Sequence, residues 1–103
     1  MSPIQIEFHP GAIKEARTAY RWYLRRSAAA AGRFKAALEA AIDQVIESPE
    51  RWPTYLHGTR CRLLRRCRFL VVYRQQGERL QVVAVAHGER RPGYWKRRNF
   101  EAE

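Results

Sequence analysis

The residues best suited to chemistry gather near the C-terminus, in the segment AHGERRPGYWKRR (86–98). His87 has an imidazole that titrates near neutral pH and can act as a general acid or base. Tyr94 and Trp95 stand among arginines, a mixture used in single-stranded nucleic acid binding, where rings stack on bases and guanidinium groups bind phosphates. The segment therefore predicts a catalytic centre, a nucleic-acid-binding segment, or a tail in which at least one of the two rings packs onto the fold.

A second basic group precedes this segment on a predicted strand. Arg60 and Arg62 share one face of that strand and lie about 7 Å apart along it, a spacing that suits neighbouring phosphates or carboxylates. An ordinary solvated sheet face explains the same residues, because edge strands often carry positive charge that prevents aggregation.

Trp22 is the third candidate, because it lies opposite the apolar stripe of a predicted helix and beside Arg25 and Arg26. An exposed tryptophan next to arginine is typical of the centre of a protein interface. The alternative is a contact between Trp22 and the N-terminal strand or the tail.

Composition limits the classes of protein to consider. The 103 residues predict a single domain over 1–103. Twenty Lys and Arg against ten Asp and Glu give a net charge of +10, which favours a nucleic acid, the ribosome or an acidic protein as partner. We expect a cytoplasmic protein without a membrane span, because no signal sequence and no long apolar run is present.

Cys61 and Cys67 are expected to be free thiols, and no metal site or cofactor is predicted.

Periodicity predicts the elements that position these residues. Alternation at Ile4, Ile6 and Phe8 indicates a strand. From Ala12 a three-to-four spacing indicates a helix, and a second helix follows Ser27 as its N-cap and stops at Ser48. The buried side of the first helix is predicted to hold Ile13, Ala16, Tyr20, Tyr23 and Leu24.

Three further strands are predicted over residues 60–65, 68–75 and 79–87, with Trp52 and Tyr55 anchoring the loop before them. The resulting β-α-α-β-β-β order indicates an α+β fold, in which a two-helix hairpin packs on one face of a mostly antiparallel four-stranded sheet. The opposite face is expected to be free. Pro92 is expected to open a short C-terminal tail or helix.

The order of a strand, a helical hairpin, SPERWP, GTRCRLLRRCRFLVVYR and VVAVAHGERRPGYWKRR resembles the RelE/ParE superfamily of bacterial toxins from type II toxin-antitoxin modules. The resemblance runs from Ile6 to Arg98. It implies a small basic toxin that is neutralised by a cognate antitoxin, encoded beside it, which wraps a segment around the domain.

The superfamily divides by target. RelE-like members are ribosome-dependent, metal-independent endoribonucleases that cut messenger RNA, whereas ParE-like members are understood to poison DNA gyrase without a hydrolytic site. Arg60 and Arg62 match basic positions of the ribonuclease pattern, and Tyr94 matches its tyrosine. Leu70 and Gly88, however, stand where that pattern has arginine. The ParE-like branch is therefore favoured.

The first hypothesis is a non-hydrolytic toxin that binds DNA gyrase, with no catalytic residue favoured. The alternatives are a ribosome-dependent ribonuclease acting on mRNA and a basic nucleic-acid-binding module without toxicity. The predicted target-binding residues are Arg60, Arg62, Arg68, Arg90, Arg91, Tyr94, Trp95, Arg97 and Arg98. The predicted antitoxin-binding residues are Trp22, Arg25, Arg26, Tyr94 and Trp95. The ribonuclease alternative would use Arg60, Arg62, Arg68, His87 and Tyr94.

Overall fold

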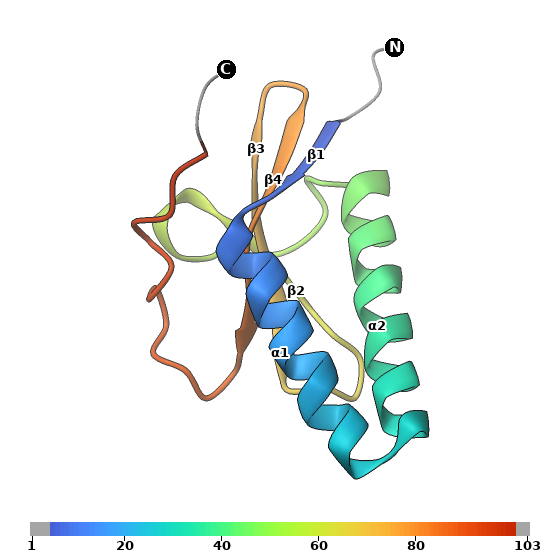
Figure 1. Ribbon diagram of the computed structural model, residues 1–103. Coiled ribbons are helices and arrows are strands. Elements are labelled where there is room, and N and C mark those ends of the chain that lie inside the picture. The colour runs from blue at the N-terminus through green and yellow to red at the C-terminus, as the bar shows by residue number, and fades with distance from the viewer. Residues whose placement is uncertain (1–4, 101–103) are drawn as a thin grey trace.

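The computed structural model describes residues 5–100 and confirms the α+β fold, so that Ile4, which the sequence assigns to the first strand, lies outside the described residues. The elements follow the predicted order (Figure 1), namely β1 (Gln5–Phe8), α1 (Pro10–Arg26), α2 (Ala28–Glu47), β2 (Arg60–Leu63), β3 (Phe69–Gln76) and β4 (Arg79–His87), with a 3-10 turn at Leu56–Gly58 before β2.

The four strands form one sheet in the order β1-β4-β3-β2. β1 runs parallel to β4, whereas the β4-β3 and β3-β2 pairs are antiparallel, so the sheet is mostly antiparallel as predicted. β1 pairs with β4 only as far as Phe8 opposite Val82. The remainder of β4 therefore has an edge that β1 does not cover.

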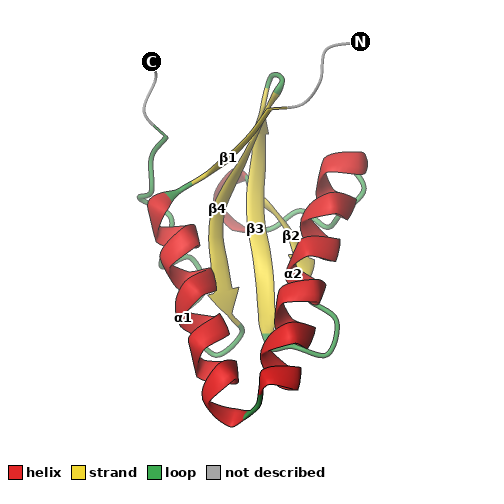
Figure 2. Ribbon diagram, turned by 45° about the vertical axis from the view of Figure 1, so that its right-hand side comes forward, coloured by secondary structure: helices red, strands yellow, loops and turns green. Residues whose placement is uncertain are grey.

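The two helices begin at capping residues. α1 starts at Pro10, two residues before the predicted Ala12, because His9 Nδ1 accepts the N–H of Gly11 at 2.9 Å and proline suits the first helical position. The predicted cap at Ser27 is confirmed, since its hydroxyl accepts the N–H of Ala30. In Figure 2 the helices meet at this turn and diverge toward their other ends.

The buried side of α1 matches the prediction in part, since Ala16, Tyr20 and Tyr23 pack against the core as predicted. Ile13 and Leu24 are 39% and 47% exposed, whereas Ala12 and Ala19 are buried. Small side chains let α1 lie close to the sheet, so the larger aliphatic residues are displaced to the flank of the helix. The predicted exposure of Trp22 is confirmed at 47%.

The sheet face expected to be free is covered. Trp95, which is 2% exposed, packs with Val72, Ala84 and Ala86 in a second core on this face, and Tyr55 joins them from the loop before β2. Figure 1 shows the C-terminal segment and this loop on the side of the strands away from α2. The expectation of a free face is therefore wrong, and the tail is the reason.

The connection after β2 and the conformation of the tail also differ from the prediction. β2 ends at Leu63 and β3 begins at Phe69, because Leu64 turns inward and is 1% exposed. No helix begins at Pro92 within the described tail, which forms successive turns instead. Gly93 has a φ of 82°, which an α-helix does not allow.

Candidate functional site

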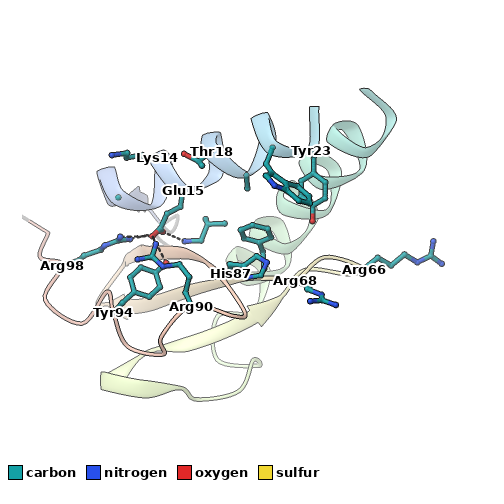
Figure 3. A pocket seen from close by; sticks show the side chains of 15 residues that line it. Lys14, Glu15, Thr18, Tyr23, Arg66, Arg68, His87, Arg90, Tyr94 and Arg98 are labelled. Atoms are coloured by element: carbon teal, nitrogen blue, oxygen red, sulfur yellow. Dashed lines mark hydrogen bonds and ion pairs between the residues drawn. The ribbon is translucent and has the colours of Figure 1, made fainter. Parts of the chain in front are cut away.

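A groove of about 770 Å³ lies between α1 and the end of β4. Its floor is largely apolar and its rim is basic. Figure 3 shows the lining side chains, which are Gly11, Lys14, Glu15, Thr18, Ala19, Trp22, Tyr23, Arg66, Arg68, Phe69, Val85, His87, Arg90, Tyr94 and Arg98.

The uncovered edge of β4 explains the inner wall of this groove. The N–H of Val85 donates to Glu15 Oε1 at 3.0 Å, and the C=O of Val83 accepts from Arg98 Nη1 at 3.1 Å. Two side chains thus replace part of the missing strand, which satisfies backbone groups that would otherwise be left unpaired at the edge.

Glu15 is the centre of this arrangement. Its carboxylate accepts two hydrogen bonds from Arg98, at 3.0 and 2.9 Å, and one from the Tyr94 hydroxyl at 2.6 Å. Figure 3 shows Glu15 pointing from α1 toward both residues. Burial first, and then the hydrogen bond to Glu15, raise the pKa of the Tyr94 phenol, so Tyr94 remains a neutral donor at physiological pH. Arg98 is occupied by Glu15 and is not available for a phosphate.

His87 lies on the groove side of the sheet, with its ring edge-on to Phe69 at 4.9 Å between centroids. Its Nδ1 accepts the N–H of Glu89 at 3.0 Å, which leaves Nε2 for other partners. Arg68 is paired with Glu89 at 2.8 Å, and Arg90 lies over the ring of Tyr94 at 3.8 Å. On the rim, Arg68 is thus held by Glu89, and Arg90 is held by Tyr94 and Glu15.

Arg60 and Arg62 share a face of β2, as predicted, but that face is turned toward α2 and the loop that follows it. Arg60 donates to the C=O of Trp52 at 2.6 Å, and Arg62 donates to Gln44 Oε1 at 2.9 Å. Neither lines the groove. Arg60 pairs with Tyr73 and His87 with Phe69, so their positions differ by four residues along β3, about 13 Å. Of the five predicted ribonuclease residues, Arg68, His87 and Tyr94 line the groove together, whereas Arg60 and Arg62 lie apart from it.

The other predicted residues divide between the groove and the rest of the surface. Trp22, Arg68, Arg90, Tyr94 and Arg98 line the groove. Arg26 lies over the Trp22 ring at 3.9 Å, which extends the same surface. Arg25, Arg91 and Arg97 are exposed and do not line it.

Trp95 is a predicted contact residue that the structure buries. Its side chain is buried on the opposite face of the sheet, where it anchors the tail, so it offers no surface to a target or an antitoxin. This outcome fits the expectation that at least one of the two tail rings packs onto the fold.

The sequence matches the family described as "ParE toxin of type II toxin-antitoxin system, parDE" over residues 6–92. The chain belongs to the ParE toxin family. The fold is also similar to a solved structure from P. aeruginosa titled "Chromosomal ParDE TA system", with a TM-score of 0.64 and 17% identity over 84% of this chain and 98% of that one. A comparison with curated proteins gives no match.

Membership of the ParE family makes the chain a toxin of a type II toxin-antitoxin system, and the family implies an antitoxin as partner. The resemblance to the ParE-like branch drawn from the sequence is thus confirmed. Sequence reasoning missed Glu15 as the organising residue of the groove. The available signal was that Glu15 is the sole acidic residue of α1, on a side of the helix close to its alanines.

The described part of this ParE toxin contains no group of three His, Cys, Asp or Glu residues placed to hold a metal ion. None of its described helices is long and apolar enough to cross a membrane. Cys61 and Cys67 are free thiols, as predicted.

Proposed function

We propose that this chain arrests growth by binding DNA gyrase without hydrolysing nucleic acid, and that its antitoxin neutralises it by occupying the groove beside α1. The observation that carries the non-hydrolytic part is that Arg60 and Arg62 lie apart from the groove lined by Arg68, His87 and Tyr94. Arg60 and Arg62 are bound to Trp52 and Gln44, while Tyr94 is bound to Glu15.

Cleavage by a 2′-hydroxyl needs preorganised cations around the extra phosphate charge, and removing one such group typically costs about 3 kcal/mol of transition-state stabilisation. Leu70 and Gly88 offer no cation at the two positions where the ribonuclease pattern has arginine. Tyr94, with a raised pKa and its proton donated to a carboxylate, is a poor general base. The geometry therefore supports binding more than catalysis.

The groove supports the antitoxin part of the proposal. Its floor holds Ala19, Phe69 and Val85, and its rim holds exposed Trp22 together with Lys14, Arg66, Arg68 and Arg90. Glu15 is the single carboxylate among the lining residues, and Arg98 neutralises it. Such a site suits an antitoxin segment with apolar anchors on one side and acidic residues beside them.

The gyrase part rests on membership of the ParE family and on the exposed basic side chains around the tail. Of the predicted target-binding residues, Arg68, Arg90, Arg91 and Arg97 are exposed. We assign target contact to these four, and the buried Trp95 is left out.

Induction of the chain alone, and together with a small reading frame encoded beside it, tests the proposal. We expect growth arrest with loss of supercoiling while translation continues, and rescue by the neighbouring frame. A His87→Ala variant should arrest growth as fully as the wild type. In purified form the chain should inhibit gyrase, and an Arg90→Ala, Arg91→Ala, Arg97→Ala variant should inhibit it less than an Arg33→Ala, Lys35→Ala, Arg51→Ala variant with the same net charge.

Two other results would replace this function. Ribosome-dependent cuts in mRNA that disappear in His87→Ala would favour the ribonuclease. Binding of nucleic acid without any growth arrest would favour a binding module without toxicity.

A further inference from the structure

The charged residues on the outward side of α1 are all basic. Lys14, Arg17, Arg21 and Arg25 follow one another at intervals of three or four residues and are all exposed. At about 100° per residue, they fall within an arc of about 80°, opposite the buried alanines of the helix. We call these four residues the α1 stripe. It extends about 17 Å along the helix axis, at 1.5 Å per residue.

No acidic residue offsets the α1 stripe. Within residues 5–100 none of its four side chains forms a hydrogen bond or an ion pair. Glu15 is the one acid of α1, and it points the other way and is bound to Arg98. Like charges three or four residues apart destabilise a helix by a few tenths of a kcal/mol per pair, about 0.2–0.5 kcal/mol.

The second helix shows what an ordinary solvated helix surface of this protein looks like. α2 mixes Arg33 and Lys35 with Glu39, Asp43 and Glu47. A general excess of basic residues would have given both helices a positive net charge, whereas the acidic residues of α2 outnumber its cations. The concentration on α1 therefore indicates a surface with its own partner.

We propose that the α1 stripe binds the phosphate backbone of double-stranded DNA. A 17 Å length of duplex carries about ten phosphate charges, which exceeds the four cations of the stripe. The surface is not flat, because a shallow hollow of about 420 Å³ lies along it between Pro10, Ile13, Lys14, Arg17, Thr18 and Arg21. A straight row of long cationic side chains, spaced along one helix and lying beside a hollow, suits the ridge of a duplex backbone.

The residue types favour a duplex over other polyanions. Single-stranded nucleic acid is bound on aromatic platforms, and the arc of the stripe contains no aromatic residue. A membrane surface requires a row of apolar side chains on the contacting side of the helix, whereas Ile13 and Leu24 lie on its flank. The stripe also lies outside most of the groove, since only Lys14 belongs to both. This inference is independent of gyrase and of the antitoxin.

Fluorescence anisotropy of the purified full-length chain with a 20-base-pair duplex tests the inference. Four phosphate contacts predict that log K falls with log salt with a slope of about −3.6, so affinity drops roughly 150-fold between 50 and 200 mM salt. An Arg17→Gln, Arg21→Gln, Arg25→Gln variant should have a slope of about −0.9 and lose only about fourfold. These exposed residues have no partners to lose, and circular dichroism would verify that the variant is folded.

The matched control is Arg33→Gln, Lys35→Gln, Arg65→Gln, which removes the same charge from exposed residues elsewhere. It should keep the wild-type slope. If both variants lose the same slope, the overall charge binds the DNA and the inference is wrong. Tighter binding to a single strand of the same length, or binding only to anionic lipid vesicles, would also overturn it.

Discussion

Glu15 on α1 and Arg98 in the C-terminal segment form a two-point ion pair at 2.9 and 3.0 Å, and each also binds one backbone group of β4. The pair therefore joins three parts of the chain that the sequence separates, namely the first helix, the last strand and the tail. The side chains of Arg98 and Glu15 are only 21% and 13% exposed. The tail that covers the second face of the sheet is held at this point.

A Glu15→Gln substitution should lower the free energy of unfolding by about 2 kcal/mol, because Arg98 keeps its charge and loses its carboxylate partner in a partly buried place. Urea denaturation measures this loss. The control is Glu89→Gln, which breaks the exposed Arg68–Glu89 pair and should cost less than about 0.5 kcal/mol. Equal losses in the two variants would show that the Glu15–Arg98 pair has no special part in stability.

Gly11 and Gly32 provide a matched pair of helical glycines. A Cβ at Gly11 would lie 2.6 Å from Cζ of Arg98, whereas a Cβ at Gly32 would have nothing within 4 Å. Gly32→Ala should raise the free energy of unfolding by about 0.5–1 kcal/mol, as expected for a helix interior. Gly11→Ala should lower it by about 1 kcal/mol, because the displaced guanidinium loses bonds to Glu15. Thermal or urea unfolding of both variants would measure the difference, and a stabilised Gly11→Ala would contradict the tight packing of Arg98.

The sequence predicted the elements because each depends on neighbours along the chain. Alternation predicted the strands, and the Ser27 cap predicted the start of α2. The alternation of side chains between the two faces of a strand likewise predicted that Arg60 and Arg62 share a face. It did not predict that this face is turned toward α2, because which side of a sheet the helices cover is decided by packing.

The groove was less predictable for the same reason. Glu15 and Arg98 are 83 residues apart, and no local pattern pairs them. The burial of Trp95 depends on an apolar second face of the sheet, formed by alternate residues of two strands that run as nearly continuous apolar sequences. Trp22 was predictable because its exposure follows from helix geometry alone.

The buried Tyr73 and the half-buried Tyr94 predict how stability depends on alkaline pH. Burial raises the pKa of Tyr73 to about 12 and raises the pKa of Tyr94 as well, whereas both titrate near 10 in the unfolded chain. The folded state therefore holds more protons above pH 10, and stability present below pH 10 is lost as the pH rises. We expect each tyrosine to contribute a fall that approaches about 1.4 kcal/mol per pH unit between pH 10 and its folded pKa.

Urea denaturation at pH 9, 10 and 11 tests this expectation. Tyr73→Phe should reduce the fall between pH 10 and 11 by about 1 kcal/mol, since phenylalanine does not titrate. The variant also loses the hydrogen bond from Tyr73 to the C=O of Pro49, so its stability should be lower throughout. A slope unchanged from the wild type would mean that Tyr73 ionises alike in both states.

Trp22 and Leu24 provide the test of where the antitoxin binds. Both are 47% exposed on α1, but only Trp22 lines the groove. If the antitoxin occupies the groove, Trp22→Ala should weaken its binding by about 2 kcal/mol, roughly 30-fold, because a large aromatic at an interface is a typical hot spot. Leu24→Ala should change it less than about twofold, since surface positions away from such contacts have small effects. Titration calorimetry with the purified antitoxin measures both, and a larger loss in Leu24→Ala would move the antitoxin from the groove to the flank of α1.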